Sequence, residues 1–269
     1  MYHTLIKNIQ IFGKTQFVKF FRKWYTEYMG VDLSKEIKFI AKDKYAYEVC
    51  QKPFPATSAI PQWWKDALPY DLNDKNFNKS KIMLENSHSN ATFKKCTPML
   101  DALGLGYIIP LWADVEIREE NGFPLISWRT SREVFRLHDG TGVEILEGYG
   151  QSQFKFLNQW IPKLPKGYSL FVTHPIGYQN SPFRAIDAII DYDKTTHVLE
   201  PPLLLKDGFE GIIEKGTPMI QVFPFKRDNW KSSFEYLDEG EFIINVDRDV
   251  KATIVNNYVK NFWSKKSFK

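Results

Sequence analysis

Cysteine is scarce in this chain. Only Cys50 and Cys96 occur in 269 residues, and no CxxC spacing is present. Small secreted domains with an insufficient core are usually rich in disulfides, and structural zinc sites need clusters of cysteine and histidine. The sequence therefore supports neither a disulfide framework nor a zinc site, and it predicts a reduced, intracellular protein.

Long hydrophobic runs are also missing. Lys7, Lys14 and Gln16 interrupt the apolar residues near the N-terminus, and charge returns at Lys19. A spanning helix needs about 20 consecutive apolar residues, and a signal peptide needs an uninterrupted apolar stretch. The sequence predicts neither of these elements, so we expect no membrane partner.

Catalytic and cofactor-binding motifs are absent as well. The five histidines show no HExxH spacing, and no glycine pair continues into the motif of a Rossmann fold or a P-loop. His138-Asp139 stands in a glycine-rich turn, where Asp-Gly is ordinary turn chemistry. We therefore predict no metal site and no resident cofactor from these patterns.

The excess of positive charge is small. The net charge is +4 and the pI is near 8.8, below the value of about 9 typical of nucleic-acid-binding domains. The surplus lysines and arginines lie near the two ends of the chain, which favours solvated helix faces, with contact to phosphate or to another subunit as the alternative. A nucleic-acid partner is not favoured.

Strand patterns dominate the middle of the chain. Asn121-Gly122 is a strong hairpin signal, and further glycine turns separate short β-branched runs. We predict a mainly β, antiparallel body over residues 105–225. The expected strands are residues 107–117, 122–128, 134–137, 143–146, 169–174, 185–193, 209–213 and 219–225.

The flanking segments differ in composition. Residues 1–50 predict an N-terminal extension with a helix over 4–29 and a strand over 35–50, and residues 51–94 a proline-rich aromatic arm followed by a surface loop. Trp63 and Trp64 should anchor the arm on the core, with a neighbouring subunit or a nucleobase as alternatives. The β body fills 95–230. Residues 231–269 predict a strand over 241–246 and a helix over 250–264.

The two helical ends carry large aromatic residues. We expect them to pack on the β body or on each other, with the lysines facing water. If the protein is instead an assembly module, one aromatic face should remain exposed for a protein partner or a second copy.

Three short motifs follow one another in a recognisable order. They are the turn Leu164–Tyr168, the strand end Ile190-Asp191, and the run from Lys215-Gly216 to Gln221. This order resembles the second half of a dUTPase-like β-clip domain. The resemblance implies an antiparallel β-clip or barrel-like fold with N- and C-terminal helices added. It also implies that Asp191 and Gln221 are catalytic and orient the attacking water.

The chain departs from that family at the substrate-binding positions. His174-Pro175-Ile176-Gly177 stands where the family has an arginine-serine pair, so the guanidinium that grips phosphate is missing. Lys194 and Thr196 replace the tyrosine and glycine of the hairpin that reads the base. An enzyme would need an arginine from elsewhere, and Arg129, Arg132 and Arg184 are the candidates.

The acids at the end of the predicted strand 185–193 could bind a ligand. Asp187, Asp191 and Asp193 should share one strand face, where a cation such as Mg²⁺ or a raised pKa would relieve their repulsion. With His174 they are our candidate ligand-binding residues. The alternative is an edge strand kept acidic against aggregation.

A second resemblance covers residues 50–230. The chain is similar here to an uncharacterised domain family of marine tailed phages and proteobacteria. The similarity lies in short motifs rich in aromatic residues and proline: Ile60-Pro61-Gln62-Trp63-Trp64, Lys95-Cys96-Thr97-Pro98-Met99 and Gly106–Asp114. The sequence thus predicts a non-catalytic phage-type binding, assembly or accessory protein, located in the host cytoplasm or in the virion. The alternative is a nucleotide-directed hydrolase that uses the Asp191 region, with Mg²⁺, on a nucleotide or another small polar ligand.

Overall fold

The computed structural model describes residues 35–69, 92–138, 144, 146–237, 240 and 257–269. The chain divides into two units, residues 1–38 and 39–269, and almost all described residues belong to the second. The expected helix over 4–29, the strand over 241–246, most of the loop over 71–94 and the first half of the helix over 250–264 lie outside the described residues.

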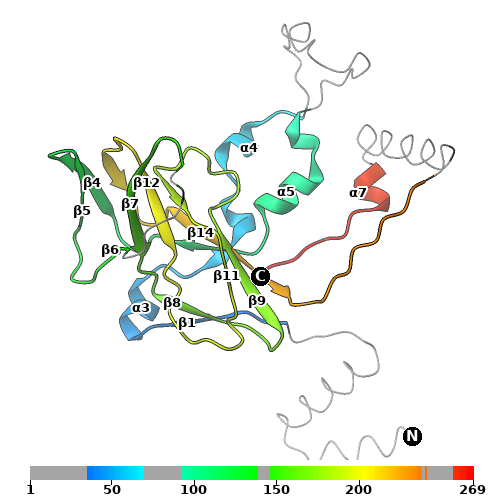
Figure 1. Cartoon of the computed structure of the whole chain (residues 1–269), viewed down its shortest axis with the longest axis horizontal. Helices are drawn as coiled ribbons and strands as arrows, with labels where there is room; N and C mark the ends of the chain where they lie inside the picture. Colours follow the sequence, from blue (N-terminus) through cyan, green and yellow to red (C-terminus); the bar gives the residue numbers. More distant parts are fainter. Residues whose placement is uncertain (1–34, 70–91, 139–143, 145, 238–239, 241–256) are drawn as a thin grey trace, which may run out of the picture. The chain divides into compact units, whose positions relative to one another are not determined.

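Antiparallel sheets are the main regular structure of the described chain (Figure 1). The largest sheet has five strands in the order β11 (Ala188–Ile190), β9 (Tyr168–Thr173), β14 (Pro218–Lys226), β3 (Tyr107–Pro110) and β2 (Phe54–Pro55). A four-stranded sheet has the order β10 (Phe183–Ala185), β12 (Pro202–Lys206), β7 (Tyr149–Phe156) and β6 (Phe135–Leu137). The predicted mainly β, antiparallel body is confirmed.

Two smaller sheets complete the β structure of the described residues. One has the order β13 (Gly211–Ile213), β4 (Val115–Glu120) and β5 (Phe123–Trp128), and the other pairs β1 (Lys38–Ala41) with β8 (Trp160–Lys163). Asn121 and Gly122 join β4 to β5 with φ values of 54° and 82°. A two-residue turn with both residues in the left-handed region is what Asn-Gly predicts, so the hairpin is confirmed.

Short helices replace two segments for which we expected none. The predicted strand over 35–50 is wrong beyond Ala41, because the Asp43 carboxylate accepts the N–H of Ala46 and starts a helix, α3 (Lys44–Val49). The predicted extended arm contains η1 (Ala56–Ala59) and α4 (Gln62–Asp66). Pro61 precedes α4, where a proline costs no helical hydrogen bond.

The remaining helices of the described residues are η2 (Phe93–Lys95), α5 (Thr97–Leu103) and α7 (Asn257–Asn261). Pro98 lies in the first turn of α5, and Gly104 ends that helix. No helix within the described ranges is long and apolar enough to cross a bilayer.

Several strand boundaries also differ from the predictions. The predicted strand over 185–193 is two strands, because Ile186 donates to the carbonyl of Pro202 and the chain then passes from β10 in one sheet to β11 in another. The run 107–117 likewise divides into β3 and β4. The partner of β6 begins at Tyr149 rather than over 143–146. Strand β12 was missed because Pro201-Pro202 hides its start.

The proline-rich arm and the C-terminal tail both contact the β body. Trp64 is buried, and the indole of Trp63 donates to the carbonyl of Gly177 at 2.7 Å, so self-anchoring of the arm is confirmed. In the C-terminal tail, the Trp263 indole donates to Asp101 of α5 at 2.8 Å, and Phe268 packs edge-on against Tyr107.

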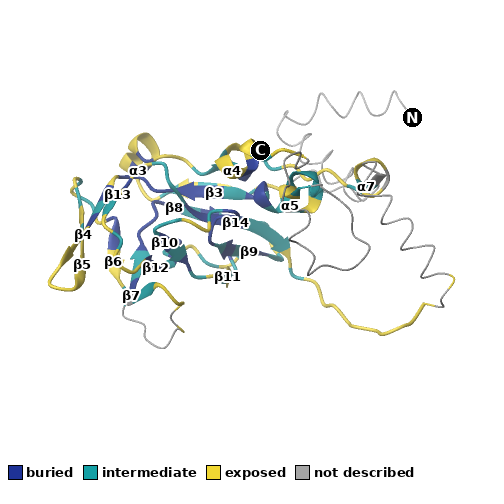
Figure 2. Cartoon of the chain, turned by 90° about the horizontal axis from the view of Figure 1, so that it is seen from above, coloured by how far each residue is buried: buried dark blue, intermediate teal, exposed yellow. Residues whose placement is uncertain are grey.

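The strands of the five-stranded sheet carry both buried and half-buried residues (Figure 2). Val172 of β9 and Val222 of β14 are paired and fully buried on one face. On the other face Phe171 and Phe223 contact each other with ring centroids 5.1 Å apart and are only half-buried. Asp187 and Asp191 lie along this second face.

Candidate functional site

Register brings two of the predicted acids onto the half-buried sheet face. Ile189 pairs with Phe171, and Asp187 and Asp191 stand two residues before and after Ile189. Because alternate residues of a strand share a face, the two aspartates flank one apolar row. Thr173 donates to Asp187 at 2.7 Å. Asp187 is exposed and bonded to a neighbouring strand.

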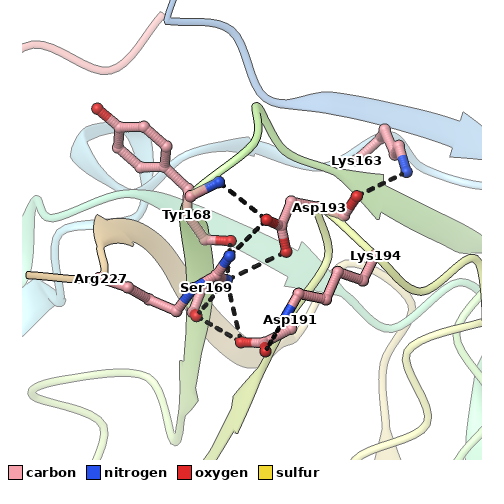
Figure 3. Close-up of polar contacts among 8 residues, drawn as sticks. Lys163, Tyr168, Ser169, Asp191, Asp193, Lys194 and Arg227 are labelled. Atoms are coloured by element: carbon pink, nitrogen blue, oxygen red, sulfur yellow. Dashed lines mark hydrogen bonds and ion pairs between the residues drawn. The ribbon is translucent and has the colours of Figure 1, made fainter.

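Asp191 directly follows β11, as the strand-end prediction required. Its carboxylate accepts the Ser169 hydroxyl at 2.6 Å and lies 3.1 Å from Arg227 Nη1 and 3.4 Å from Lys194 Nζ (Figure 3). The Ser169 hydrogen bond, followed by the charge of Arg227, lowers the pKa of Asp191. A general base at neutral pH needs a pKa near 7, so the environment shifts this group in the opposite direction.

Asp193 follows Asp191 by two residues and also bonds to Arg227. Its side chain is 3% exposed, it accepts the Gly167 N–H at 2.8 Å, and both Nη atoms of Arg227 donate to it. The hydrogen bond from Arg227 is the main cause that lowers the pKa of Asp193 to about 2. Asp191 and Asp193 therefore converge on Arg227 Nη1, each at 3.1 Å, whereas Asp187 is bonded to Thr173 and lies apart from them.

Arg227 is the residue that sequence reasoning missed. Its guanidinium also donates to the carbonyl of Tyr168 at 2.8 Å and to the Ser169 hydroxyl at 3.0 Å (Figure 3). We call Arg227, Ser169, Asp191, Asp193 and Lys194 the Arg227 cluster. It joins the ends of β9, β11 and β14. None of the described hydrogen bonds or ion pairs of Arg129, Arg132 or Arg184 involves Asp191.

Gln221 lies away from Asp191. Gln221 pairs with Thr173, while Asp191 bonds to Ser169. Thr173 and Ser169 are four residues apart on β9, so the positions of Gln221 and Asp191 are separated by about 13 Å along the strand direction. The prediction that Asp191 and Gln221 lie close together is wrong.

The side chain of Gln221 is 1% exposed and fully bonded within the protein. Its oxygen accepts the Ile176 N–H at 2.9 Å, and its nitrogen donates to the carbonyls of Ala102 and Leu105. Gln221 therefore ties the end of α5 to β14, and none of its polar atoms points to a solvent-filled hollow.

His174 is also committed to the structure. Its Nε2 donates to the Tyr178 carbonyl at 3.0 Å, and its Nδ1 accepts the Ala185 N–H at 3.3 Å. Burial lowers the pKa of His174. This pattern requires a neutral ring with the proton on Nε2, which links the end of β9 to β10.

A shallow hollow of about 550 Å³ lies beside Asp191. The ionisable residues of its lining are Asp191, Lys194, Lys155, His197 and Glu200. Gln221, Asp187 and His174 do not line it. Among the described residues, no group of three or more His, Cys, Asp or Glu side chains could hold a metal ion.

A second feature stands out directly after the Arg227 cluster. Residues 228–237, which we call the aromatic segment, form neither helix nor strand and are exposed along their length. Trp230, Phe234 and Tyr236 are 89%, 95% and 93% exposed. Sequence reasoning placed the exposed aromatic faces at the helical ends and missed this segment.

No protein-family model matches this chain, and no curated protein is detectably similar to it in sequence.

Proposed function

We propose that this protein is a non-catalytic binding or assembly module of phage type, in which a β-clip body similar to that of dUTPases serves as the scaffold. The observation that carries the proposal is the exposure of Trp230, Phe234 and Tyr236. Burial of one such side chain stabilises a protein or complex by about 1.5 to 3 kcal/mol. Contiguous exposed apolar residues of this kind mark sites of protein contact.

The acidic region supports the same proposal. Ser169, Arg227 and Lys194 hold Asp191 as a carboxylate, and Gln221 is fully bonded elsewhere. An attacking water would need an unoccupied base and a second orienting group nearby. The Arg227 cluster instead has the bonding pattern of a structural lock between strand ends.

The second candidate function is a nucleotide-directed hydrolase. The hollow beside Asp191 favours it, because Lys155, Lys194 and His197 could contact a phosphate there. Such an enzyme would use Asp191 to position a Mg²⁺ ion and its substrate.

Hydrolysis of deoxynucleoside triphosphates by the full chain with Mg²⁺ separates the two functions. We expect no turnover above buffer for the natural protein, and no change in Asp191→Asn or Asp187→Asn. The two variants are matched, since each aspartate accepts a hydroxyl from β9. Turnover that disappears in Asp191→Asn and persists in Asp187→Asn would establish the hydrolase and overturn the proposal.

A further inference from the structure

The aromatic segment has the residue pattern of a β-strand but no sheet. Trp230, Phe234 and Tyr236 occupy even positions, while Lys231 and Glu235 occupy odd positions. In an extended chain this spacing places the three aromatic rings and Asp228 on one face, and Lys231, Glu235 and Leu237 on the other. Within the described residues, no backbone hydrogen bond pairs this segment with a strand.

Strand β5 offers a complementary edge. It is the outer strand of the three-stranded sheet, and its six residues make it the longest edge strand among the described residues. Phe123 and Leu125 are 72% and 49% exposed and lie on one face of it. A long, apolar, uncovered edge strand is a template for pairing with another chain.

The ladder of the hairpin shows which groups of β5 are open. Glu120 and Phe123 flank a two-residue turn, so this pair exchanges both backbone hydrogen bonds. Every second pair along the ladder does the same, and the pairs between them direct their N–H and C=O groups outward. The N–H groups of Ile126 and Trp128 consequently point away from β4. Pro124, which has no N–H, occupies an outward position too, so it does not disturb the ladder.

A hollow of about 280 Å³ lies at the turn end of the β4–β5 hairpin. Phe123 and Pro124 of the hairpin line it together with Phe154 of β7 and Phe209. Arg118, Glu119, Lys206 and Asp207 also line it, so a tryptophan or tyrosine of an arriving strand would find apolar contact for its ring and polar partners for its N–H or O–H.

We propose that the aromatic segment of one copy adds as a strand to the open edge of β5 in a second copy. This inference rests on the proposed binding function and specifies that the partner is a second copy of the chain. The chain itself carries both halves of the contact: an unpaired strand with an aromatic face, and an unpaired edge with exposed Phe123 and Leu125.

The two halves start from different sheets: the aromatic segment follows β14, whereas β5 belongs to the sheet of β4 and β13. In both views the aromatic segment leaves the sheets on the side opposite the β4–β5 hairpin (Figures 1 and 2). The contact is therefore made between copies and is head-to-tail, so each copy offers one donor strand and one acceptor edge. A heterologous contact of this kind closes into rings or extends into filaments.

The test uses two full-length variants and light scattering over a range of concentrations. The donor variant carries Trp230→Ser, Phe234→Ser and Tyr236→Ser, and the acceptor variant carries Phe123→Lys and Leu125→Lys. All five positions are exposed, so their replacement should leave the fold intact. We expect the natural protein to form assemblies whose mass rises with concentration, and each variant alone to be a monomer.

Mixing the two variants gives the decisive result. The donor variant keeps an intact β5 edge and the acceptor variant keeps an intact aromatic segment, so an equimolar mixture should give a dimer and nothing larger. Lys231→Ser with Glu235→Ser, on the opposite face of the segment, should assemble as the natural protein does. A monomeric natural protein at high concentration, or a mixture that stays monomeric, would overturn the proposal.

A peptide experiment covers the case in which the acceptor variant folds poorly. A fluorescent peptide of residues 228–237 should bind the donor variant, and its binding should fall at least tenfold when Phe123→Lys is added. Equal binding to both proteins would refute the β5 site. These outcomes can be told apart from those of the hydrolysis assay. A protein that is monomeric and shows no turnover would refute the strand exchange but still fit a module that binds another protein. A protein that assembles and shows turnover would refute only the proposed non-catalytic function.

Discussion

At the scale of single residues, the polar side chains singled out by the sequence serve as links between elements. Gln221 joins α5 to β14, His174 joins β9 to β10, and Asp193 joins the turn at Gly167 to Arg227. Each is buried and has its hydrogen bonds completed by the protein. Their replacement should therefore act on stability.

Gln221→Leu tests the first link. The leucine fills similar space but leaves the Ile176 N–H and the carbonyls of Ala102 and Leu105 without their partner. A buried polar group left unpaired costs about 1 to 3 kcal/mol, so we expect a loss of at least about 2 kcal/mol in urea unfolding. The exposed control Gln62→Leu should change stability by about 0.5 kcal/mol or less. Equal effects would show that Gln221 is not a link.

His174 makes stability depend on pH. Burial lowers its pKa below the ordinary value of 6.5, with the charge of Arg184 acting in the same direction and that of Asp187 against it. The unfolded chain then binds a proton before the folded chain does, so stability falls as the pH drops below about 6.5. In His174→Gln the fall in thermal midpoint between pH 7 and pH 5 should be smaller. An unchanged slope would contradict a neutral, doubly bonded ring.

Asp193 acts at lower pH. Its folded pKa is about 2, against an ordinary value of 3.8, so its contribution is present above about pH 4 and is lost as the pH falls toward 2. We expect Asp193→Asn to be less stable than the natural protein at pH 6, with the difference shrinking at pH 3. Asp187→Asn is the control, because Asp187 is exposed and makes no ion pair with Arg227. A difference that stays constant with pH would argue against the ion pair.

At the scale of elements, the sequence predicts strands best where the turn residues allow only one turn conformation. Asn121-Gly122 sets the β4–β5 hairpin and its register, because both turn residues need a positive φ. The division of 185–193 into two strands could not be predicted, since it depends on the hydrogen bond between Ile186 and the distant Pro202. The helices η1 and α4 were missed because the prolines of residues 53–69 were interpreted as excluding regular elements, and α3 was missed because residues 35–50 were predicted as a strand.

The candidate site was predictable only in part, for a similar reason. The sequence places Asp187 and Asp191 on one face by the period of a strand, and this is correct. The separation of Asp191 from Gln221 follows from the register of β9 against β14, which no local pattern encodes. Arg227 was missed because it lies just beyond the predicted strand 219–225 and has no motif around it.

The start of β3 shows how tightly the elements approach one another. Gly106 has a φ of +72°, and a Cβ there would lie 2.1 Å from the carbonyl oxygen of Val222. Gly148 has a similar φ of +80° but open space around it. We expect Gly148→Ala to cost about 1 to 2 kcal/mol through its backbone conformation alone, and Gly106→Ala distinctly more in the same urea titration. Equal costs would mean that β14 yields to the added methyl group.

At the scale of the whole molecule, the hydrogen bonding of the interior differs from that of the surface. The buried polar groups are bonded, apart from the Oε1 of Gln159 among the described residues. The aromatic segment and the outer edge of β5, in contrast, have a strand pattern and an open ladder without partners. A chain that satisfies its interior and leaves one strand and one edge uncovered has the parts of a repeating assembly.

Limited proteolysis should reveal that assembly without any substitution. Chymotrypsin cuts after large aromatic residues in exposed, extended backbone, and Trp230, Phe234 and Tyr236 meet both conditions in a single copy. If these side chains pack on β5 of a second copy, cleavage after them should slow at least tenfold between dilute and concentrated protein, as followed by mass spectrometry. Phe93, 72% exposed and distant in sequence from both halves of the contact, provides the internal reference. Slowing at Phe93 to the same extent would indicate general aggregation, whereas protection confined to the aromatic segment is the result that the strand exchange requires.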